Sequence, residues 1–150
     1  MRSGINLTAF VAHSFLPNDR AVVDNLIKTI RTAGFSPISG ERPEARAVSE
    51  KIKRRIHRAS VFIAILTRRH AVTDSHTWTT SPWIIEEKGY SLGQNPARPI
   101  VLLIEHGIPI PGETGGLEGD LEYFVFDRSH IDLAQRKLRN VLRDIAASQT

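Results

Sequence analysis

The chain has 150 residues, 41% of them hydrophobic, which fits one domain with one core. The absence of cysteine excludes disulfides, thiolate metal sites and cysteine nucleophiles, and it favours a reducing, cytoplasmic location. The net charge of +4 and the pI near 9.8 permit binding of anions, including dinucleotides, but do not select one anion.

The N-terminal half predicts three strands separated by two helices. Residues 1–15 hold one basic residue and a short apolar run, so they predict a first strand and not a signal peptide. In chain order, the elements are a strand over Leu7–Ala12, a helix capped by Asn18 or Asp19 that runs to about Ala33 before Gly34, a strand over Phe35–Ile38, a helix after Ser49 with Ile52, Ile56 and Ala59 facing inward, and a strand over Val61–Leu66.

The C-terminal half continues the alternation. Its elements are a helix with Ser81 as cap and Pro82 at the first position that runs to about Leu92 before Gly93, a strand over Ile100–Ile104, a strand over Tyr123–Phe126, and a helix that starts near Ser129 with Asp132 as capping-box partner. Five glycines and two prolines between Glu105 and Asp120 predict a loop where a further helix would be expected. No run reaches the ~20 apolar residues of a membrane span, so we expect no membrane partner.

This alternation predicts one domain over residues 1–150. Apolar strands without strict alternation are typical of a parallel sheet buried on both faces. We therefore expect a flavodoxin-like, three-layer α/β/α fold with a five-stranded parallel sheet in the order 2-1-3-4-5. Ligands bind such sheets beyond the carboxyl ends of the strands, where the strand order reverses. Here that point lies between the first and third strands, beside the loops His13–Asn18 and Thr67–Ser81.

The sequence lacks the motifs of several functions that are common in this fold. The loop after the first strand lacks GxGxxG, and the chain lacks GxxxxGK[ST]. A phosphoacceptor receiver domain needs acidic residues at the ends of the first and third strands, where this chain has Ala12-His13-Ser14 and Thr67-Arg68-Arg69. His70 and His76 are six residues apart, which does not suit a shared metal ion on a helix. We therefore expect no metal and no dehydrogenase cofactor.

Five ordered segments resemble one family. They are Phe10–Phe15 with the acidic residue that follows, the loop Ser39–Val48 that leads into Ser49–Ile52, the strand region Ala59–Thr67, the run Ser81-Pro82-Trp83-Ile84-Ile85-Glu86-Glu87, and Arg98–Leu103. In this order they resemble Toll/interleukin-1-receptor-like (TIR) domains, especially bacterial ones. The fourth segment is the most specific, because it is similar to the family's Ser-x-Trp-x-x-x-Glu motif.

The resemblance implies an enzyme that cleaves NAD. In enzymatic TIR domains the catalytic glutamate lies four residues after the tryptophan, which is Glu87 here. Helical spacing supports this choice, because Trp83 and Glu87 share a helix face, whereas Glu86 is turned by about 100° toward solvent or an arginine. Tyr90 lies three residues after Glu87 and can border the same pocket.

NAD is then a substrate, and no separate cofactor is expected. Nicotinamide is a cationic leaving group, so the cost of cleavage lies in the positive charge on the ribose, which a fixed carboxylate stabilises. Trp83 or Phe15 can stack on a planar heterocycle, and Ser14 and Arg46 can bind phosphate or ribose oxygens. Hydrolysis and cyclisation both remain open as outcomes.

Each of these residues also has a purely structural interpretation. Glu87 can be an exposed helix carboxylate, Trp83 can pack the helix on the sheet, Phe15 can be a hydrophobic staple, and Arg46 can be solvated. The second helix carries a basic stripe that is either solvated or contacts an acidic partner or a neighbouring protomer. The stripe consists of Lys51, Arg54, Arg55 and Arg58. No aromatic residues interleave with it, so direct nucleic-acid binding is not expected.

The resemblance also implies partners. Family members often act when assembled through TIR–TIR contacts, in which the loop Ser39–Val48, the BB loop, of one protomer completes the site of the next. An antiviral or cell-suicide pathway with a sensor partner would follow, and the chain is either a standalone protein or the N-terminal part of a longer sensor. The alternative function is a non-catalytic TIR adaptor, and a third is a nucleoside deoxyribosyltransferase. Trp78, in a polar loop, can support the crevice or an assembly contact.

Overall fold

The computed structural model describes residues 7–39, 50–95, 97–109 and 121–149, except for the side chains of residues 82, 83, 86, 92 and 121. The elements are β1 (Thr8–Ala12), the 3-10 turn η1 (Pro17–Asp19), α1 (Arg20–Thr32), β2 (Ser36–Ser39), α2 (Glu50–Arg58), β3 (Val61–Leu66), α3 (Pro82–Gln94), β4 (Ile100–Glu105), β5 (Leu121–Phe126), the 3-10 turn η2 (Arg128–His130) and α4 (Ile131–Ser148). Each predicted strand is present, with bounds shifted by at most two residues.

The strands form a five-stranded parallel sheet in the order β2-β1-β3-β4-β5, so the predicted topology is confirmed. In the register at its centre, Phe10 of β1 lies opposite Phe62 of β3, and Phe62 lies opposite Ile100 of β4. The six residues of β3 and the six of β4 are all buried, as expected for central strands covered on both faces.

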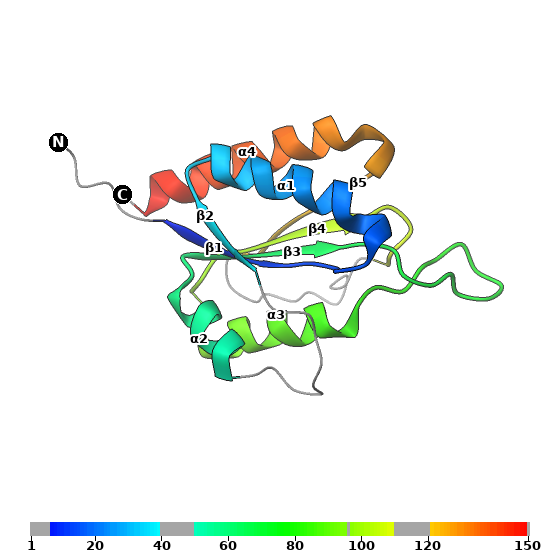
Figure 1. The fold of residues 1–150 in the computed structure, drawn as a ribbon, viewed down its shortest axis with the longest axis horizontal. Coiled ribbons are helices and arrows are strands. Elements are labelled where there is room, and N and C mark those ends of the chain that lie inside the picture. The colour runs from blue at the N-terminus through cyan, green and yellow to red at the C-terminus, as the bar shows by residue number, and fades with distance from the viewer. Residues whose placement is uncertain (1–6, 40–49, 96, 110–120, 150) are drawn as a thin grey trace.

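Two helices cover each face of the sheet. Figure 1 shows α1 and α4 on one face and α2 and α3 on the other. Alternate residues of β1 serve the two layers: Ala9 and Val11 pack in the cluster under α1 and α4, whereas Phe10 and Ala12 pack in the cluster under α2 and α3. The Phe10 and Phe62 rings stack at 5.5 Å between centroids. Successive apolar residues along a strand therefore contribute in turn to the two hydrophobic clusters, one on each face of the sheet.

Asp19 and Ser81 occupy the predicted N-cap positions of α1 and α3, although neither side chain makes a capping hydrogen bond; the cap predicted at Ser129 is wrong. The Asp19 carboxylate makes no such bond because it is buried and binds residues from other loops. Ser129 does not cap the last helix. Instead, Asp127 accepts hydrogen bonds from the Ser129 N–H and hydroxyl, which opens η2 before α4. Gly93 is likewise inside α3, which ends at Gln94 and not at Leu92.

Trp78 packs at the edge of the α2/α3 layer. It is partly buried against that cluster, its backbone N–H donates to the Gly107 carbonyl at 2.8 Å, and the Arg68 guanidinium lies 5.0 Å from its ring. Its loop between β3 and α3 projects beyond the sheet in Figure 1. Trp78 thus anchors the base of this loop to the turn after β4.

Gly107 should be the least replaceable glycine among those described. Its φ is +103°, and an added Cβ would lie 2.9 Å from Trp78 Cδ1; Gly34, with φ +97°, has no atom within 4 Å of its added Cβ. Both replacements by alanine cost about 1–2 kcal/mol in backbone strain, and Gly107→Ala should lose about 1–3 kcal/mol more through the clash. Urea unfolding of the two variants measures the difference; equal losses would contradict this contact.

Among the described residues, none of the helices combines the length and the apolar character that a membrane crossing requires.

Candidate functional site

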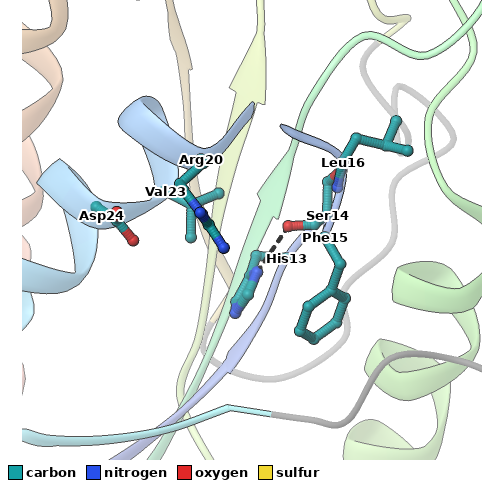
Figure 2. Close-up of a pocket in the computed structure, with 7 residues that line it drawn as sticks. All are labelled: His13, Ser14, Phe15, Leu16, Arg20, Val23 and Asp24. Atoms are coloured by element: carbon teal, nitrogen blue, oxygen red, sulfur yellow. Dashed lines mark hydrogen bonds between the residues drawn. The ribbon is translucent and has the colours of Figure 1, made fainter. Parts of the chain in front are cut away.

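A pocket lies between the end of β1 and the start of α1. It has a volume of about 200 Å³ and is lined by His13, Ser14, Phe15, Leu16, Arg20, Val23 and Asp24. Figure 2 shows the His13 ring between the α1 side chains and Phe15, whose ring is directed away from α1. Ligand pockets for drug-sized molecules measure about 300–1,000 Å³, so this pocket fits one ring or one sugar and not a whole dinucleotide.

The imidazole of His13, which lines this pocket, is held in one tautomer by its hydrogen bonds. Its Nδ1 lies 2.8 Å from the Ser14 carbonyl, which can only accept, so Nδ1 carries the proton. Its Nε2 lies 3.2 Å from the Ser39 hydroxyl at the end of β2, and the neutral ring is 4.7 Å from the Phe15 ring. The pKa of His13 is lowered, mainly by burial and against the opposing effect of the Ser14 carbonyl. The imidazole is therefore a neutral bridge between β1 and β2.

This lowered pKa has a consequence for stability. Below pH 6.5 the unfolded chain gains a proton at His13 that the folded chain resists, so stability is full above pH 6.5 and is lost as the pH falls toward the folded pKa. The slope is at most about 1.4 kcal/mol per pH unit. Urea unfolding at two pH values should show a smaller acid loss for His13→Asn than for the wild type or for the exposed-site control His76→Asn. The same acid loss in all three would contradict the assignment.

Ser14 uses its hydroxyl locally. Its Oγ accepts the Leu16 N–H at 3.1 Å, which shapes the loop after β1. Within the described part of the chain, no residue accepts the hydroxyl proton, which can therefore be donated to a ligand. Phe15 is exposed and stands at the rim of the pocket. The structure therefore brings together Ser14 and Phe15, two of the predicted substrate-binding residues.

Glu87 is buried on the face of α3 that packs on the sheet. Its exposed fraction is 2%, and Ile84 and Ser91 on the same helix face are also buried. The structural alternative of an exposed helix carboxylate is therefore wrong. Tyr90 packs partly buried on the α2/α3 cluster, with Lys53 Nζ 5.5 Å from its ring centroid. Tyr90 thus contributes to the contact between α2 and α3.

The helix that lines the pocket, α1, and the helix that carries Glu87, α3, cover opposite faces of the sheet. Val23 of the pocket belongs to the α1/α4 cluster, whereas Ile84, beside Glu87 on α3, belongs to the α2/α3 cluster. Arg46 and most of the BB loop lie outside the described residues, as does the side chain of Trp83, so the predicted pairing of Trp83 with Glu87 stays a prediction.

The carboxyl edge of the sheet carries a polar network that the sequence analysis did not predict. Thr67, after β3, donates to Asp19 at 2.9 Å, and Arg128, after β5, donates to Asp19 and to Glu105 at the end of β4. Both carboxylates are buried. The signal was available, because Glu105 and Arg128 end or follow neighbouring strands and parallel strands end at one edge.

The fold is flavodoxin-like, and solved structures share it. A CMP N-glycosidase of Clostridium botulinum aligns with a TM-score of 0.60 at 16% identity, over 89% of this chain and 98% of that one. A flavodoxin-like domain of Synechococcus aligns with 0.58 at 9%, over 95% and 97%. A response regulator receiver protein of Sinorhizobium medicae aligns with 0.51 at 14%, over 91% and 97%. The sequence matches no known family model and no curated protein. These likenesses define the class of fold.

Proposed function

We propose that this chain is a TIR-type enzyme that cleaves the nicotinamide–ribose bond of NAD, with Glu87 as its catalytic carboxylate. The observation that supports the proposal is the burial of Glu87, 2% exposed, on the sheet-facing side of a helix. A buried carboxylate costs folding free energy, and proteins concentrate such groups at functional sites. The motif around Glu87 supplies the substrate class.

The chemistry needs one carboxylate. The bond between the ribose anomeric carbon and the nicotinamide nitrogen breaks, and its electron pair leaves with neutral nicotinamide. Glu87 stabilises the positive charge that develops on the ribose. Water then adds to the anomeric carbon and releases a proton, giving ADP-ribose; attack by an atom of the adenosine part gives a cyclic product instead.

The remaining predicted residues bind the substrate in this proposal. Phe15 stacks on a heterocycle and Ser14 donates to a ribose or phosphate oxygen, while Arg46, Trp83 and Tyr90 complete the site. The 200 Å³ pocket holds one part of the dinucleotide, so the rest lies over the edge of the sheet. Self-association through TIR–TIR contacts, as in antiviral defence, would add surface from a second protomer. We also propose a cytoplasmic location.

A second candidate substrate is a nucleoside monophosphate. One structure with this fold is described as a CMP N-glycosidase, so the fold is compatible with cleavage of the bond between a base and a ribose. The same carboxylate would act, but the leaving group would be a neutral base that needs protonation. Glu87 would then alternate between acid and base, which NAD cleavage does not demand.

A substrate panel tests these assignments. Concentrated wild-type protein is incubated with NAD, CMP and a deoxynucleoside pair, and the released bases are separated chromatographically. We expect free nicotinamide from NAD and intact CMP. Cytosine release alone would replace NAD by a nucleotide substrate, and base exchange between deoxynucleosides would indicate a transferase. No product from any of them, including under crowding that forces assembly, would favour a non-catalytic adaptor.

A further inference from the structure

Residues from three loops and from the end of β4 meet in one polar network at the carboxyl edge of the sheet. Arg128 Nη2 lies 2.9 Å from Asp19 Oδ1 and 2.8 Å from Glu105 Oε1, and its Nε lies 2.5 Å from Glu105 Oε2. Its Nη1 donates to the Asn18 carbonyl at 3.2 Å. Thr67 Oγ1 donates to Asp19 Oδ2 at 2.9 Å, and the Arg68 N–H donates to Glu105 Oε1 at 2.8 Å. The guanidinium of Arg128, which follows β5, therefore joins the loop after β1 to the end of β4.

The guanidinium of Arg128 compensates the negative charges of the two buried carboxylates. Asp19 is 3% and Glu105 1% exposed, and burial of two carboxylates is costly without a cation. The side chain of Arg128 is 30% exposed, so it carries its charge at a smaller desolvation cost. A planar fork can contact both carboxylates and a carbonyl at once, which a lysine ammonium cannot do in the same geometry. The pKa of Arg128 is raised, chiefly by its hydrogen bonds to Glu105.

The network acts on the wall of the pocket. Asp19 and Asn18 belong to η1, and the Asp19 N–H donates to the Leu16 carbonyl at 3.0 Å. Leu16, in turn, donates to the Ser14 hydroxyl and lines the pocket. A short chain of bonds thus runs from Arg128 through Asp19 to Leu16 and Ser14. No apolar packing is needed to transmit it.

We propose that Arg128 is a positioning residue that fixes the loop 13–19, and with it the ligand-binding wall of the pocket. The role of this loop in binding substrate rests on the proposed function; its fixation by Arg128 does not. The alternative is that Arg128 only fastens β5 to the sheet. In that case its removal loosens the whole fold and not the loop in particular.

Amide hydrogen exchange separates the two. In Arg128→Met, we expect the amides of residues 14–16, 18 and 19 to exchange at least 10-fold faster than in the wild type, after correction for the change in global stability. The amides of β3 and β4 should change only with global stability. Arg136→Met, at an exposed position of α4, is the control and should change neither. Arg128→Lys should recover global stability in part but not the slow exchange of the loop, because it lacks the fork.

A second variant keeps the test decisive if Arg128→Met does not fold. Thr67→Val removes only the other hydrogen bond to Asp19 and should accelerate the same amides more mildly. Uniform acceleration of all amides, or unchanged exchange at residues 14–16, 18 and 19 in every folded variant, would overturn the proposal. If the chain also turns over NAD, Arg128→Lys should raise KM several-fold with a smaller change in kcat. Absence of turnover would bear on the proposed function alone.

Discussion

Glu87→Gln is expected to lower nicotinamide release from NAD by about 10²–10³-fold, the loss typical of removing one preorganised electrostatic group from an active site. Glutamine has the same shape and keeps one carbonyl oxygen, so packing on the sheet is retained. It lacks the negative charge that, in the proposed mechanism, stabilises the developing ribose cation. Steady-state release of nicotinamide by wild type and variant measures the effect.

The control is Glu50→Gln, which neutralises a highly exposed glutamate on α2 whose carboxylate lies 3.3 Å from Lys53 Nζ. It should leave turnover unchanged.

Unfolding measurements add a second comparison, because a buried carboxylate that is kept for catalysis lowers the stability of the fold. Glu87→Gln should therefore be as stable as the wild type or more stable. Equal turnover in both chains, with Glu87→Gln clearly destabilised, would make Glu87 a structural residue.

Arg98→Met is expected to lower the free energy of unfolding by about 3 kcal/mol, through the loss of several charge-assisted hydrogen bonds. Arg98 is 5% exposed and donates to the carbonyls of Ala59 and His57, where α2 ends, at 3.1 and 3.4 Å. It also donates to the Ser91 hydroxyl at 3.0 Å and to Gln94 Oε1 at 2.7 Å on α3. Its removal leaves buried oxygens without these donors.

Burial opposes this stabilisation in part, since desolvation lowers the pKa of Arg98 and so disfavours its charged form. The helix end of α2 compensates, because the partial negative charge of its last carbonyls faces the guanidinium. Chemical denaturation of Arg98→Met beside the exposed-site control Arg143→Met measures the net effect. A loss no larger than that of the control would mean that methionine packing replaces these bonds.

The sheet could be predicted from the sequence almost completely, because several separate apolar runs each indicate a buried strand. Apolar runs such as Val61–Leu66 and Ile100–Ile104 are buried on both faces, so each residue contributes to the same prediction. Alternation with helices predicts parallel strands, and the order 2-1-3-4-5 was expected from the flavodoxin-like fold. Gly34 was predicted to end the first helix and does so with φ +97°, because few other residues adopt that conformation.

Side chains with long-range partners could not be predicted in the same way. In the sequence, Asp19 resembles a helix cap. Only the tertiary structure shows that its carboxylate oxygens accept hydrogen bonds from Thr67 and Arg128, which are 48 and 109 residues away. The four-residue spacing predicts that Glu87 shares a helix face with Trp83; Glu87 is buried, whereas the side chain of Trp83 lies outside the described residues. Periodicity assigns the inward face of a helix but not the sheet face that the helix covers, so only the structure shows that α3 lies on the face opposite α1, which contributes Arg20, Val23 and Asp24 to the pocket.

Mass balance on NAD is the most direct test of cleavage at the nicotinamide–ribose bond. Wild-type protein is incubated with NAD over a wide range of protein concentrations, and nicotinamide, ADP-ribose and cyclic ADP-ribose are quantified together. We predict one nicotinamide released for each NAD consumed, with the remainder recovered as ADP-ribose or its cyclic form. NAD that stays intact at every protein concentration, or that is lost without nicotinamide release, would contradict it.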